Sequence, residues 1–208
     1  MTDDEVEVFH LDDIHYEGPN LDLPAPPQDL PYAEYEDWRS GELLAANGIP
    51  ATEDSLVDAL QTQDGVLLGA AAHTAGSRGV GAAAPQLAHL AQGADDYAGV
   101  EAAYALARLG HARGEALLRR ALDRPVGPYL SPVLAAGYLA QLGDPSGFAV
   151  VREGLASDLL AVRMLACKQL AFFLSFPDMD ARGLLELALE DPDPSVRRQA
   201  RVELPGGG

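Results

Sequence analysis

The pattern of hydrophobic and polar residues repeats along most of the chain, and alanine marks the repeat most clearly. Five alanines recur at spacings of 31, 33, 31 and 34 residues: Ala71, Ala102, Ala135, Ala166 and Ala200. Four residues before them stand Leu67, Ala98, Ser131, Val162 and Val196, and four residues after them stand Ala75, Leu106, Leu139, Leu170 and Leu204. Because residues four apart share one face of an α-helix, this phrase predicts five similar helices with a buried stripe.

Glycine follows these helices at a fixed distance and predicts where they stop. With the first residue of the phrase as position zero, position twelve holds Gly79, Gly110 and Gly143, and then Leu174. Glycine tolerates the left-handed conformation that ends many helices. Each phrase follows another predicted helix, which gives the pairs 52–61 and 66–77, 85–92 and 97–109, 114–122 and 129–142, 147–156 and 160–174, and 181–190 and 195–204. A period in the low thirties built from helices is typical of a stacked α-solenoid.

The N-terminal part of the chain does not follow this repeat. Residues 1–31 contain a proline-rich stretch that cannot form a stable helix, so we expect an extended leader there. Residues 32–46 are expected to form a helix that caps the solenoid, with a stop at Asn47 and Gly48. The predicted organisation is therefore a leader over 1–31, a capping helix over 32–48, a solenoid over 49–205 and a frayed end over 206–208.

The last pair carries a resemblance to a known family. Residues 184–204, LLELALEDPDPSVRRQARVEL, resemble a HEAT repeat, closest to the short variety of phycobilisome lyases and many bacterial scaffold proteins. The likeness covers roughly residues 52–205, and the earlier repeats depart from it at Ala98, Gly99 and Ser131, where the family usually has Val and Arg. The resemblance implies an all-α, right-handed α-solenoid of about five HEAT-like helix pairs that binds something. It does not imply lyase activity, because the family is functionally mixed.

One face of the repeated helices is unusually apolar for a surface. Positions two, six and nine lie opposite the buried stripe, yet they hold mainly small and apolar residues. Either the curvature of the repeats buries these positions, or a ligand, a partner or the leader covers them as a groove. The second explanation makes the following residues candidates for binding a partner: His73, Val100, Tyr104, Val133, Met164, Lys168 and Arg198.

Charge narrows the kind of partner. The chain has a net charge of −18; residues 1–55 hold 15 acidic residues and one basic residue, a net of −14, and the remainder carries −4. Nucleic-acid binding is disfavoured because affinity for phosphate depends on Lys and Arg. A basic protein partner is favoured by steering and charge complementarity. Apolar residues within 5–23 also suggest that the leader packs on the solenoid, although a flexible acidic tail remains an alternative.

No set of residues predicts a catalytic, cofactor or metal site. His10 and His15 flank Asp12 and Asp13, but no helical histidine pair or cysteine pair accompanies them. Cys167, the single cysteine, is expected to be a buried or half-buried thiol. A lone cysteine and an acidic N-terminus favour a reducing, cytoplasmic setting, and no apolar run approaches the roughly 18 residues of a membrane span.

These observations favour a non-catalytic protein-interaction module, such as an inhibitor, an immunity-type protein or an adaptor, which binds through the concave face or the acidic leader. Two other classes stay open. A lyase-like enzyme would need a pocket with polar groups near His73, Tyr104 or Cys167. A nucleic-acid-binding helical repeat is the third class, and the charge of the chain argues against it.

Overall fold

A computed structural model describes residues 21–27, 30, 32–93, 97–126 and 130–204, and every regular element in these ranges is a helix. The all-α prediction is therefore confirmed for this part of the chain. Most of the expected leader, including the cluster around His10 and His15, lies outside the described residues. The α-helices are α1 (Tyr32–Ala46), α2 (Glu53–Thr62), α3 (Gly65–Ser77), α4 (Ala84–Leu90), α5 (Tyr97–Arg108), α6 (Ala112–Ala121), α7 (Ser131–Gln141), α8 (Phe148–Leu155), α9 (Leu160–Phe173), α10 (Ala181–Ala188) and α11 (Pro194–Glu203). Short 3₁₀ turns at Gly81–Ala83, Ala91–Gly93 and Pro145–Gly147 join some of them.

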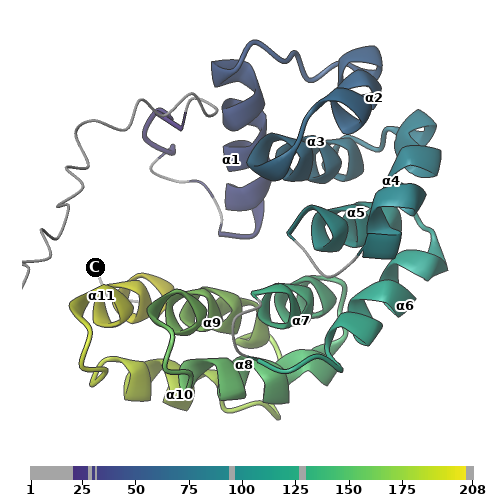
Figure 1. Cartoon of the computed structure of the whole chain (residues 1–208). Coiled ribbons are helices and arrows are strands. Elements are labelled where there is room, and N and C mark those ends of the chain that lie inside the picture. The colour runs from purple at the N-terminus through teal and green to yellow at the C-terminus, as the bar shows by residue number, and fades with distance from the viewer. Residues whose placement is uncertain (1–20, 28–29, 31, 94–96, 127–129, 205–208) are drawn as a thin grey trace, which may run out of the picture.

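The helices follow one another along a curved row (Figure 1). The inner helices α3, α5, α7, α9 and α11 lie on the inside of the curve, and the outer helices α2, α4, α6, α8 and α10 lie on the outside. α1 lies on the inner side, next to α3. We call the inward-facing side of the inner helices the concave face.

The repeated alanines lie in the packed core between the helices. All five, from Ala71 to Ala200, are fully buried, as the four-residue spacing predicts. Glycine allows similar approaches elsewhere: a Cβ atom on Gly76 would lie 2.6 Å from the Cα of Ala105, and one on Gly114 would lie 2.4 Å from the carbonyl oxygen of Ala103. Small residues therefore set the short spacing at which these helices stack.

Glycine ends the inner helices as predicted. Gly79, Gly110 and Gly143 have φ angles of 69°, 82° and 88°, in the left-handed region. After each of them the next backbone N–H reaches back to a carbonyl in the preceding helix, as in the bond from His111 to Leu106 (2.9 Å). This is the hydrogen-bond pattern of a Schellman motif. Leu174 takes the fourth position, and α9 ends there without a left-handed residue.

Some of the helix starts are capped by a side chain. Thr52 accepts a hydrogen bond from the backbone of Ser55 at the start of α2, and Asp193 accepts one from Ser195 at the start of α11. α6 begins at Ala112, two residues before its predicted start, because His111 already has the extended conformation of a residue that precedes a helix.

The middle parts of three inner helices are buried on all sides. Every residue from Gly69 to Gly76, from Gly99 to Leu106 and from Ser131 to Ala140 is buried. The positions expected to face outward on α3, α5 and α7 are therefore inside the molecule. The reason is that outer helices, neighbouring inner helices and, over α3, the added helix α1 surround them. Burial decreases toward the C-terminus, where α11 buries only Val196, Ala200 and Glu203.

Candidate functional site

α1 is attached to the concave face by an apolar C-terminal half. Leu43 and Leu44 are almost fully buried, and α1 packs mainly against α3. The helix ends at a glycine turn, where Gly48 has a φ of 72° and the N–H of Ile49 bonds to the carbonyl of Leu44 (2.9 Å). The N-terminal half of α1 instead presents charged side chains to the concave face.

His73 is the centre of a buried polar network that joins α1 to this face. Its ring is 2% exposed; Nδ1 lies 2.8 Å from Glu101 Oε2, and Nε2 lies 2.8 Å from Asp37 Oδ1. Burial alone would lower the pKa of His73, but the hydrogen bonds to Asp37 and Glu101 raise it to about 9. The imidazole is therefore protonated at neutral pH and donates from both ring nitrogens.

Glu101 is a carboxylate inside the fold, with only 1% of its surface exposed. Besides the bond from His73, it accepts a hydrogen bond from the hydroxyl of Tyr138. Tyr138 stacks on Tyr104 with ring centroids 4.0 Å apart, and Tyr104 donates to Gln141 Oε1 (3.0 Å). Burial raises the pKa of both phenols, that of Tyr104 to about 12, so both remain donors.

Arginine and lysine bind the other side of the network. Arg108 donates to Asp37 through both of its terminal nitrogens, at 2.6 and 3.1 Å, and its guanidinium lies 5.7 Å from the ring centre of Tyr104. Burial would raise the pKa of Asp37, but the bonds from His73 and Arg108 lower it to about 2. Lys168 of α9 donates to Glu36 and lies 5.1 Å from the ring centre of Tyr35. Acidic residues of α1 are thus matched by cations of α3, α5 and α9.

Two hollows flank the N-terminal half of α1. One, of about 630 Å³, is lined by Glu34 and Asp37 of α1 together with Tyr104, Arg108, Ala140, Gln141, Leu142, Ala171, Phe172 and Ser175. The other, of about 250 Å³, is lined by Glu36 and Arg39 of α1 together with Tyr97, Glu101, Leu134, Tyr138, Gln141, Leu165, Lys168, Gln169 and Phe172. Buried Gln169 Oε1 and Gln141 Nε2 have no hydrogen-bond partner in the described part of the chain. This half of α1 is held by polar side chains rather than by close packing.

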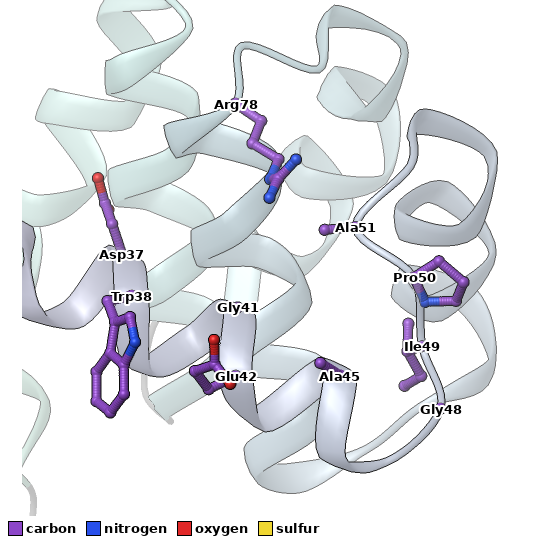
Figure 2. A pocket seen from close by; sticks show the side chains of 10 residues that line it. All are labelled: Asp37, Trp38, Gly41, Glu42, Ala45, Gly48, Ile49, Pro50, Ala51 and Arg78. Atoms are coloured by element: carbon purple, nitrogen blue, oxygen red, sulfur yellow. The ribbon is translucent and has the colours of Figure 1, made fainter. Parts of the chain in front are cut away.

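A third hollow, the N-terminal pocket, lies beside α1 and the turn that follows this helix (Figure 2). Its volume is about 510 Å³. It is lined by Asp37, Trp38, Gly41, Glu42, Ala45, Gly48, Ile49, Pro50, Ala51 and Arg78. Asp37 and Trp38 lie at one end, Ile49 and Pro50 at the other, and Arg78 reaches over from the end of α3 (Figure 2).

The structure brings three of the predicted binding residues together. His73, Tyr104 and Lys168 all meet α1 or its ion pairs at the concave face. Val100 and Val133 are fully buried between helices, Met164 is partly buried against the C-terminal core, and Arg198 is exposed on α11. A partner-binding role for any of the seven stays a prediction. Cys167 is buried as expected, and burial raises the pKa of its thiol to about 12.

Sequence reasoning missed the residues that bind His73. Asp37 lies 36 positions before His73 and Glu101 lies 28 positions after it, so no local pattern links them. One signal was present: Glu101 is the only charged residue in the apolar stretch 98–107. A charge in such a position needs a buried partner, and His73 is the partner that the fold supplies.

The centre of the polar network is closed off from solvent. His73 and Glu101 are enclosed, so a substrate could not reach them while α1 is in place. No protein-family model matches the chain, and no curated protein matches it in sequence. Within the described ranges, none of the helices has the length and apolar character needed to span a bilayer.

Proposed function

We propose that this chain is a non-catalytic protein-binding module: a right-handed α-solenoid of about five helix pairs that resemble short HEAT repeats. The even spacing of the buried alanines and the glycine turns after α3, α5 and α7 support this description. Stacked helix pairs present extended curved surfaces, which such proteins use to bind partners.

One observation carries the proposal. The concave face already receives a helix, α1, through matched charges and hydrogen bonds from His73, Arg108 and Lys168. A surface that recognises a helix of its own chain in this way has the chemistry for helix-in-groove recognition of a partner. The seven candidate residues named from the sequence include three of this surface.

The partner proposed is a basic protein, bound in a reducing, cytoplasmic setting. The net charge of −14 in residues 1–55 would attract such a protein and would raise its rate of association. An inhibitor, an immunity-type protein or an adaptor would each act by this kind of binding, without a reaction of its own.

Affinity capture with two forms of the chain tests the proposal. The full chain and a form without residues 1–31 are used as baits, captured proteins are identified by mass spectrometry, and the affinity of each purified candidate is measured at two salt concentrations. We expect a basic protein that binds the full chain and loses affinity on the order of tenfold between low and physiological salt. An acidic partner, or an affinity independent of salt, would contradict the proposal.

A further inference from the structure

Most helix glycines of this chain are explained by a neighbour. A Cβ atom on Gly69 would lie 2.2 Å from the ring of Tyr97, and one on Gly137 would lie 1.6 Å from the amide of Gln169. Contacts this short do not occur between real atoms, so a larger residue at these positions would displace its neighbour. A neighbouring side chain therefore occupies the space beside each of these two glycines.

Gly41 has no such explanation. It lies inside α1, its φ angle is not in the left-handed region, and no atom lies within 4 Å of the position that its Cβ would take. A glycine inside a helix destabilises the helix by roughly 0.5–1 kcal/mol relative to alanine. No packing contact offsets this cost. Residues that break a local rule without a structural gain are expected at functional sites.

Gly41 forms part of the floor of the N-terminal pocket. In Figure 2 it lies on α1 between Trp38 and Ala45, below the side chain of Arg78. The pocket volume of about 510 Å³ falls within the range of sites that bind small molecules or short peptide segments. The absence of a side chain at Gly41 leaves the backbone of α1 open to whatever enters.

The lining of this pocket favours a cation with an apolar stem. Glu42 makes no ion pair within the described residues, so its carboxylate is available to a ligand. Trp38 offers an indole ring, the side chain that binds cations best. Ala45, Ile49 and Pro50 supply an apolar wall for the methylene groups of a long side chain. Arg78 lies on the opposite rim, so repulsion by its positive charge places a bound cation at the Glu42 and Trp38 side of the pocket.

We propose that the N-terminal pocket binds one arginine or lysine side chain of a protein partner, with its stem over Gly41 and its charged group between Glu42 and Trp38. This inference rests on the proposed function in taking the partner to be a basic protein. It adds a specific site beside α1 and the turn that follows this helix.

The test uses the full chain and two short peptides. The probe is the capped peptide acetyl-Ala-Arg-Ala-amide, and its control carries citrulline, which has the shape of arginine without its charge. Trp38 is the only tryptophan of the chain, so its fluorescence reports binding at this pocket directly. We expect a saturable change in emission with the arginine peptide, and affinity lower by about tenfold or more for the citrulline peptide.

Three variants decide whether the pocket is the site. Gly41→Leu places a side chain where the structure leaves open space; we expect unchanged or higher resistance to urea, with affinity lower by about tenfold or more. Glu42→Gln should weaken binding about fivefold or more, through loss of a charged hydrogen-bond acceptor. Glu53→Gln removes one exposed acid at the start of α2 and serves as the matched control, with affinity within about twofold of the original.

Several results would overturn the proposal. They are an unchanged affinity in Gly41→Leu, a loss of stability in that variant, equal binding of the citrulline peptide, or peptide binding without any change at Trp38. If these results appear while affinity capture still yields a basic partner, the partner binds elsewhere and only the pocket assignment fails.

Discussion

His73 contributes to stability in a way that depends on pH. The ring joins α1, α3 and α5 through two hydrogen bonds to carboxylates, although it is almost fully buried. Burying an uncharged imidazole would leave Asp37 and Glu101 without a cation between them. The protonated form is therefore part of the fold.

The stability of the protein should fall as the pH rises from about 6.5 to about 9. The pKa of His73 rises from 6.5 in the unfolded chain to about 9 in the fold, so the folded state holds a proton that the unfolded state loses in this interval. The stabilisation from His73 is complete below pH 6.5, and it is lost as the pH rises through about 9. In total it is on the order of 3 kcal/mol. Asp37 stays charged throughout, because its pKa is about 2.

Urea unfolding at a series of pH values measures this effect. In His73→Gln the free energy of unfolding should change much less over the same interval. An unchanged slope in the variant would show that another group is responsible. Comparison above pH 9 separates the effect of charge from the effect of packing, since both proteins then lack the imidazolium.

At the scale of the element, glycines in the turns and glycines inside the helices are subject to different physical constraints. Gly110 ends α5 with a φ of 82°, and its missing Cβ would meet open space, so only the backbone conformation restricts this position. Gly41 has both open space and an ordinary helical backbone. The two positions therefore respond to alanine in opposite directions.

Gly110→Ala should destabilise the protein by about 1–2 kcal/mol, because a side chain is strained in the left-handed region. Gly41→Ala should stabilise it by about 0.5–1 kcal/mol through helix propensity. Thermal and urea unfolding of both variants measure the difference. Two changes of the same sign would contradict the conformational explanation.

The helices and their ends could be read from the sequence, because both depend on local patterns. Spacings of four residues locate the buried stripe, and Gly79, Gly110 and Gly143 mark the stops. The place of α1 could not be read in this way. Its contacts with His73, Arg108 and Lys168 join residues 36 to 132 positions apart, and they depend on the curvature of the whole row. For the same reason the burial of Val100 and Val133 followed from tertiary packing and not from helix periodicity.

At the scale of the whole molecule, α1 connects distant parts of the row. Its C-terminal half packs on α3, and Glu36 and Tyr35 in its N-terminal half reach Lys168 of α9. The Lys168 and Glu36 side chains are 25% and 17% exposed, so solvent weakens their attraction. The contact with Lys168 therefore fixes the position of the N-terminal half of α1, but it adds little to the free energy of unfolding.

Lys168→Gln should loosen α1 without unfolding the protein. We expect a loss of stability within about 1 kcal/mol, together with faster hydrogen exchange in residues 34–40. Arg182→Gln, which removes an exposed surface pair with Glu186, is the control and should leave exchange in α1 unchanged. Equal exchange in both variants would mean that Lys168 does not hold α1.

Because α1 connects α3 to α9, the curved row of helices should be stiffer against straightening than against tightening. A force that straightens the curve moves α9 away from α3 and must first break the contacts at Lys168. A force that tightens the curve brings these helices together and narrows the hollows beside α1. The molecule should therefore resist extension more than compression, because extension must break the contacts between Lys168 and α1.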